Sequence, residues 1–236
     1  EAASGRYYSI SGSGAAPRGA AREFFARRGY RKMPLDGILS AAVPGAVGTY
    51  VRAWERFGTR SLAELFAPAV HYAREGFPVS AALSRQMVEN SEKLRQCPAT
   101  AAIFLRDGAP YQPGDILVQK DLAASLEKVA RDGEEVFYRG ELAAAIQRCS
   151  DVSGGLFAPD DLASHATVVE EPLTVDYRGY AVHQTPPASQ GFIMLEMLNI
   201  LEGFPLGDLP AGSAEAVHLL VEAKKLAYAD RLRYAG

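Results

Sequence analysis

Apolar residues recur every three or four positions through most of the first 150 residues, which is the spacing of one face of an α-helix. The clearest helix is SLAELFAPAVHYAREG. Ser61 and Glu64 match the pattern of a capping box at its start, and Gly76 suits its end. The same spacing predicts five further helices, at residues 20–28, 44–57, 80–94, 120–133 and 141–151.

The pattern changes to alternation between residues 166 and 187, where apolar and polar side chains take turns as they do in a strand with two different faces. Arg178-Gly179 fits the two-residue turn of a β-hairpin. One face of the first strand is predicted to carry Leu173, Val175 and Tyr177, and the other Thr174 and Asp176. A hairpin therefore follows the helical part of the chain.

Two more helices are predicted after the hairpin. Between Gly191 and Glu202 the only internal polar residues are Glu196 and Asn199, so this helix should be covered on most sides, between a sheet and other helices. The last helix begins after its N-cap residue, Ser213. Because sheets usually have four or more strands, a lone hairpin beside a covered helix indicates a sheet completed by another chain or by sequence outside this one.

Charge and composition remove several classes of function. The 236 residues carry a net charge of −3, so no nucleic-acid footprint is visible. The densest basic stretch, Arg27-Arg28 with Arg31-Lys32, is most simply the solvated end of a helix, with a weak anion-binding patch as the alternative. In the pair Asp160-Asp161, Asp160 is most simply the N-cap of a short turn. The alternative is that the two carboxylates are the catalytic pair of a glycosidase. No apolar run reaches the roughly 18 residues of a membrane span.

No cofactor or metal site is expected, because GxSxG, P-loop and HExxH motifs are absent and the four histidines lack the spacing of neighbouring ligands. Cys97 and Cys149 form no CxxC, and are read as buried thiols or a single disulfide. Ser189 is the most notable hydroxyl. Ser189-Gln190-Gly191 lies where a strand becomes a helix and could offer backbone N–H groups to an anion, with an N-cap serine as the simpler alternative.

A set of motifs in fixed order adds a resemblance over residues 11–236. The motifs are AAVPGAVGTY, LFAPAVHYAREGFPVS, EEVFYRGELAAAI, GGLFAPDDLASH, EPLTVDYRGYAV, PPASQGFIMLEMLNILEGF and HLLVEAKKLAYADR. Together they resemble the gamma-glutamyltranspeptidase family. The resemblance implies an α+β fold, the αββα sandwich of N-terminal-nucleophile hydrolases. Residues 1–236 would be a single, mainly helical large-subunit portion, starting after the family's first strands and completed by a small subunit from the same precursor.

The resemblance also implies an activity. A precursor cleaves itself, and the new N-terminal threonine of the small subunit attacks a gamma-glutamyl or related amide bond of a small molecule, so no catalytic residue is expected in this chain. The alternatives are an acylase-like amidohydrolase without glutamyl specificity, or a non-catalytic ligand-binding relative. A dimer of heterodimers and a periplasmic or secreted location would follow bacterial members, with the cytoplasm as the other compartment.

One position departs from the family pattern. In gamma-glutamyl enzymes, a segment ending in Thr-Ala-Pro carries an arginine that pairs with the α-carboxylate of the substrate, and the matching position here is Ser13. A serine hydroxyl does not replace a bidentate guanidinium, although Arg18 is near in sequence. The candidate substrate-binding residues are therefore Ser13, Arg18, Ser189 and Gln190, and an acyl group without a free α-carboxylate is favoured over glutathione.

Overall fold

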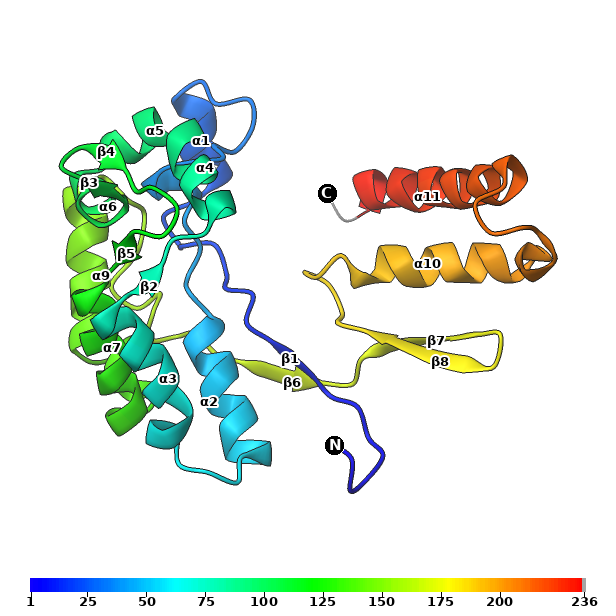
Figure 1. Cartoon of the computed structure of the whole chain (residues 1–236), viewed down its shortest axis with the longest axis horizontal. Coiled ribbons are helices and arrows are strands. Elements are labelled where there is room, and N and C mark those ends of the chain that lie inside the picture. Colours follow the sequence, from blue (N-terminus) through cyan, green and yellow to red (C-terminus); the bar gives the residue numbers. More distant parts are fainter. Residues whose placement is uncertain (235–236) are drawn as a thin grey trace. The chain divides into compact units, whose positions relative to one another are not determined.

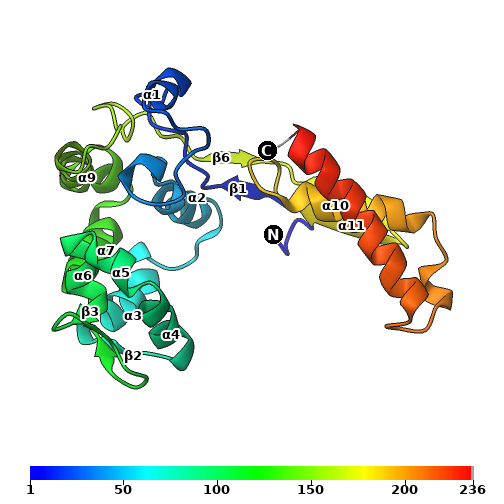
Figure 2. The same ribbon diagram turned by 90° about the horizontal axis from the view of Figure 1, so that it is seen from above.

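The computed structural model describes residues 1–234, which divide into two compact units. One unit is Gly58–Gly155, and the other combines Glu1–Phe57 with the chain from Leu156 onward. Figures 1 and 2 show the elements of both units. The chain is mostly helical with short strands, which agrees with the predicted α+β class.

The unit formed by Gly58–Gly155 is mainly helical, and its chain repeatedly folds back on itself. Its elements are α3 (Leu62–Glu75), β2 (Phe77–Pro78), α4 (Ala81–Glu89), α5 (Ser91–Arg95), α6 (Pro98–Phe104), β3 (Leu105–Arg106), β4 (Ala109–Pro110), β5 (Ile116–Leu117), α7 (Lys120–Asp132), α8 (Glu135–Tyr138) and α9 (Glu141–Val152). Helices α3 and α7 lie side by side (Figure 1). Val79, Met87 and Leu117 form its buried core, each at most 3% exposed.

Local sequence accounts for the helix ends in this unit. The predicted capping box is present, because the Ser61 hydroxyl accepts a hydrogen bond from the Glu64 N–H and the Glu64 carboxylate accepts one from the Ser61 N–H. Gly76 ends α3 with a φ of 90°, which favours glycine. The helix predicted over 80–94 is instead two helices, because Asn90 leaves helical geometry and its side-chain amide donates to the Gln86 carbonyl.

The second unit begins with short elements and ends with long ones. They are β1 (Ser9–Ser11), α1 (Arg22–Arg27), α2 (Ala46–Phe57), β6 (Val168–Glu170), β7 (Leu173–Tyr177), β8 (Tyr180–Gln184), α10 (Gly191–Glu202) and α11 (Ala214–Tyr234), with 3₁₀ turns at Ile38–Ser40 and Leu206–Asp208. Strand β1 pairs antiparallel with β6, so the chain's first strand and a strand more than 150 residues later form one ribbon. Strand β1 was not predicted, because three residues carry too little alternation to read.

The predicted hairpin is β7–β8, with Val175 opposite Val182 and Thr174 opposite His183. Arg178 and Gly179 both have positive φ, as a type I′ turn requires. The tip is tied to the end of α10, because the Arg178 N–H donates to the Glu202 carboxylate and its guanidinium donates to the Phe204 carbonyl at 3.0 Å. In each of the four ribbons of the described residues, two strands pair only with each other, so β7 and β8 keep open outer edges.

Helix α10 lies between the hairpin and α11, as Figure 1 shows. Three of its large side chains, Ile193, Leu195 and Leu201, are each at most 6% exposed, while Met194 is 42% exposed, so the helix is covered on most sides, as predicted from sequence. Helix α11 contacts α10, and its own buried residues are Ala216, Ala223 and Ala227. Ser213 caps α11, accepting a hydrogen bond from the Ala216 N–H.

The remaining circumference of α11 has two faces, assigned from the helical spacing of 3.6 residues per turn. One, the polar face, carries Glu215, His218, Glu222, Lys225, Ala229 and Arg233. The other, the bulky face, carries Val217, Leu220, Val221, Tyr228 and Leu232, which are 39% to 71% exposed. Large apolar side chains therefore lie exposed along this side of α11, where Lys224 falls among them by the same spacing and its ammonium lies 5.3 Å from the centroid of the Tyr228 ring.

Candidate functional site

The segment that carries Ser13 is held by backbone contacts with the entry to α2. The Val43 N–H donates to the Ala15 carbonyl at 3.0 Å. The two segments approach each other so closely that a Cβ on Gly14 would collide with the Val43 carbonyl, and a Cβ on Gly12 would collide with the Thr49 hydroxyl. Ser13 itself is exposed between these glycines. The segment is thus fixed in place while the Ser13 side chain stays accessible.

Arg18 is engaged by two carboxylates. Its backbone N–H donates to Asp161 at 3.1 Å, and its guanidinium lies 3.7 Å from Asp161 and 3.8 Å from Asp160. Asp161 is 5% exposed and also accepts from the Ala158 N–H at 2.7 Å, so the carboxylate that holds this turn is that of Asp161, and Asp160 contributes only its contact with Arg18. With two negative neighbours, Arg18 offers a substrate carboxylate less charge than a free arginine would.

Ser189 and Gln190 lie in the turn between β8 and α10. The Ser189 hydroxyl accepts a hydrogen bond from the Gly191 N–H at 3.1 Å, while the N-cap position is occupied by Gln190, which makes no side-chain cap. Ser189 therefore stabilises the turn from one position before the N-cap. Gly191 is needed because a Cβ there would meet the Gln184 side chain. Both Ser189 and Gln190 stay predictions as substrate-binding residues.

Sequence reasoning missed a cluster on the hairpin face that carries Thr174 and His183. The Tyr7 ring stacks on the His183 ring with centroids 4.1 Å apart, and the Thr174 hydroxyl lies 2.8 Å from His183 Nδ1. The alternation of the hairpin placed Thr174 and Asp176 on one face, which the register confirms. Tyr7 carries no sequence signal, because it precedes a strand of only three residues.

Other site classes find little support within residues 1–234. No group of three or more His, Cys, Asp or Glu side chains there could hold a metal ion. None of the described helices is long and apolar enough to cross a membrane. Cys97 and Cys149 are free thiols, and both are exposed, so the prediction of buried thiols was wrong.

Comparison with known proteins decides the family. The family model described as gamma-glutamyltranspeptidase matches residues 1–236. The chain belongs to the gamma-glutamyltranspeptidase family. Among curated relatives, Acylase ACY 1 proenzyme of Pseudomonas sp. (strain SE83) is 44% identical over 83% of this chain. Glutathione hydrolase-like YwrD proenzyme of Bacillus subtilis (strain 168) is 41% identical over 94%, and the glutathione hydrolase proenzyme of Escherichia coli (strain K12) is 40% identical over 87%.

Solved structures of the family share the fold. The Helicobacter pylori gamma-glutamyltranspeptidase matches 99% of this chain and 68% of its own, with a TM-score of 0.93 and 31% identity. A cephalosporin acylase from Bacillus halodurans matches 96% of this chain and 43% of its own, with a TM-score of 0.91 and 32% identity. The predicted fold class, with the N-terminal-nucleophile hydrolase architecture of these relatives, is confirmed.

This family chain spans only part of its relatives' length. It covers 35% of the Acylase ACY 1 proenzyme, 42% of the YwrD proenzyme and 36% of the Escherichia coli proenzyme. The relatives named above fall into two activity groups, glutathione hydrolases and acylases, and the name proenzyme implies that those curated relatives are cleaved.

Proposed function

We propose that this chain is the large-subunit portion of an autoprocessed amide hydrolase and acyltransferase of the gamma-glutamyltranspeptidase family. The observation that carries the proposal is the family match over residues 1–236. In the proposed reaction, the hydroxyl of a threonine at the N-terminus of a second chain attacks an amide carbonyl. The amine leaves with a proton, an acyl ester forms, and water or an acceptor amine releases the acyl group and restores the hydroxyl.

The second chain would be the small subunit cut from the same precursor, and both units of this chain would belong to one domain completed by it. Three features support this assembly: the open edges of β7 and β8, the exposed bulky face of α11, and relatives that are themselves proenzymes. Unpaired strand edges and large apolar faces are normally covered in folded proteins. A dimer of such heterodimers would be the larger assembly.

Glutathione hydrolase and acylase activities would differ in the acyl group that they accept, and Ser13 favours an acylase specificity. Ser13 stands where a gamma-glutamyl enzyme has its carboxylate-binding arginine, and Arg18 already faces Asp160 and Asp161. A free α-carboxylate would then lack a bidentate partner, so donors without that carboxylate should be preferred. Ser189 and Gln190 are proposed to line the same acyl site.

The test uses the complete protein with gamma-glutamyl-p-nitroanilide and a set of N-acyl-p-nitroanilides without an α-carboxylate. We expect release of nitroaniline, a two-chain intact mass, and an acyl adduct on an N-terminal threonine with at least one donor. A protein that forms no such adduct with any donor contradicts the enzyme function and favours the ligand-binding alternative.

Ser13→Arg separates the two acyl specificities. It should raise kcat/KM for the gamma-glutamyl donor by about tenfold, because a charge-assisted hydrogen bond contributes roughly 1.5–3 kcal/mol and part is lost to imperfect placement. The matched control is Ser13→Lys, a point charge without the planar fork, which should give a smaller gain. Unchanged kinetics in Ser13→Arg would show that position 13 does not face the acyl group.

A further inference from the structure

A cavity lies against α1. The chain reverses after α1 because the N–H groups of Arg28 and Tyr30 both donate to the Phe25 carbonyl, and Gly29 takes a φ of 79°. The reversal brings the segment after α1 back beside the helix and leaves a cavity of about 420 Å³. Its lining residues are Ala20, Arg22, Phe25, Ala26, Tyr30, Arg31, Lys32 and Met33.

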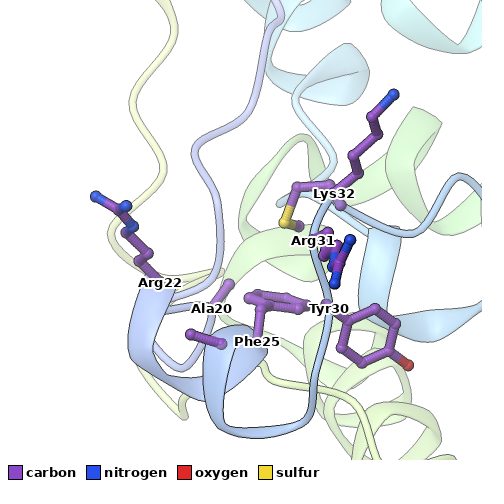
Figure 3. Close-up of a pocket in the computed structure, with 8 residues that line it drawn as sticks. Ala20, Arg22, Phe25, Tyr30, Arg31 and Lys32 are labelled. Carbon is purple, nitrogen blue, oxygen red and sulfur yellow. The ribbon is translucent and has the colours of Figure 1, made fainter.

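The inside of this cavity is apolar. Phe25 is 5% exposed and contacts the edge of Tyr30, with ring centroids 5.8 Å apart. Met33, 54% exposed, adds a flexible thioether to the wall. Figure 3 shows the Phe25 ring at the centre of the group. Aromatic and thioether surfaces of this kind suit an aromatic or aliphatic ligand body.

The rim is cationic and unneutralised. Arg22 lies on one side of Phe25, and Arg31 and Lys32 lie on the other (Figure 3). Within residues 1–234, none of these three cations has an ion pair or a side-chain hydrogen bond, whereas Arg74 pairs with Glu127 and Arg131 pairs with Asp132. Three long, exposed cationic side chains around an apolar floor leave positive charge available to a ligand.

We propose that this cavity binds a small amphipathic anion, with a carboxylate or phosphate held at the cationic rim and an apolar body against Phe25. The volume lies within the range of roughly 300–1,000 Å³ typical of small-molecule pockets. The sequence allows the basic stretch from Arg27 to Lys32 to be either a solvated helix end or an anion-binding patch, and the cavity favours the anion-binding patch. None of the residues that line this cavity is assigned to the proposed acyl site.

The experiment is a ligand-observed NMR titration of the complete protein with three probes: phenylbutyrate, phenyl phosphate and the uncharged phenylbutanol. We expect both anions, or one of them, to bind at least about fivefold more tightly than the alcohol, and about 0.5 M salt to weaken that binding. A preference between the two anions identifies carboxylate or phosphate as the natural head group. Equal binding of the alcohol, or no binding of either anion, overturns the proposal.

Matched variants assign the binding to this cavity. Arg31→Gln with Lys32→Gln should weaken anion binding by about fivefold to tenfold, because two exposed charge interactions are lost. Arg27→Gln with Arg28→Gln removes the same two charges next to the cavity but outside its lining, and should alter affinity by less than about twofold. Equal losses in both would reveal a general charge effect and contradict the assignment. Because no turnover is needed, failure here leaves the hydrolase proposal intact, and the reverse also holds.

Discussion

Helices α10 and α11 pack against each other yet bury opposite kinds of side chain. Helix α10 buries Ile193, Leu195 and Leu201, while the buried residues of α11 are three alanines. Alanines allow the two helix axes to approach closely, but they remove little apolar surface from water. Most of the exposed large apolar side chains of α11 lie on its bulky face instead, while Leu226 lies outside it. The difference supports the proposal that α11, more than α10, packs against a second polypeptide.

The largest effect on stability should come from a substitution in α10. Leu195→Ala removes a side chain that is 5% exposed and should lower the free energy of unfolding by about 2–4 kcal/mol, because a cavity remains. Chemical denaturation of the complete protein, followed by circular dichroism, measures it. Leu226→Ala, at a position 57% exposed on α11, should cost less than about 1 kcal/mol. Equal losses would remove the contrast between the helices.

The buried alanines of α11 should give the next-largest effect on stability. Ala223, 2% exposed, faces α10, so Ala223→Leu forces the helices apart and should cost about 1–3 kcal/mol of unfolding free energy. Ala229→Leu adds the same atoms on the polar face and should change stability by less than about 0.5 kcal/mol. If Ala223→Leu were tolerated as well as Ala229→Leu, the α10–α11 contact would be looser than the structure shows.

The smallest effect concerns a carboxyl between these helices. Burial raises the pKa of Glu196, and a hydrogen bond with Asp230 and its negative charge raise it further. A raised carboxyl pKa lowers stability as pH rises from the unfolded-state value through the folded-state value. Glu196→Gln should therefore stabilise the protein near neutral pH by less than about 1 kcal/mol, an advantage that disappears below pH ~4.

Glu222 supplies the control of opposite sign for that pH series. The hydrogen bond from Lys225 lowers the pKa of Glu222 on the polar face of α11, so its charged form favours the folded state. Glu222→Gln should accordingly bring no stabilisation at neutral pH. Parallel pH–stability curves for the two variants would contradict the opposite pKa shifts of Glu196 and Glu222.

Regular periodicity made most of the fold predictable. The capping box of α3, the hairpin turn at Arg178-Gly179 and the covered helix α10 all follow from local chemistry, because each is specified within a few residues of sequence. Strands of two or three residues, such as β1, were not predictable, because their pairing partner is distant and their own pattern is too short.

The site was less predictable than the fold. Motif order identified the segments around Ser13 and Ser189, but not that Arg18 is held by Asp161, because that contact spans 143 residues. The stacking of Tyr7 on His183 was missed for the same reason. The cavity beside α1 arises from a backbone reversal that basic residues alone do not specify.

Thiol labelling of α11 tests most directly whether a second polypeptide covers the bulky face. Val221→Cys and Ala229→Cys, in the complete protein, are treated with iodoacetamide and followed by peptide mass spectrometry, with Cys97 and Cys149 as exposed references. In this chain alone both positions are exposed. Cover by another chain predicts that Val221→Cys reacts at least about tenfold more slowly than Ala229→Cys. Equal rates at the two positions would contradict the account.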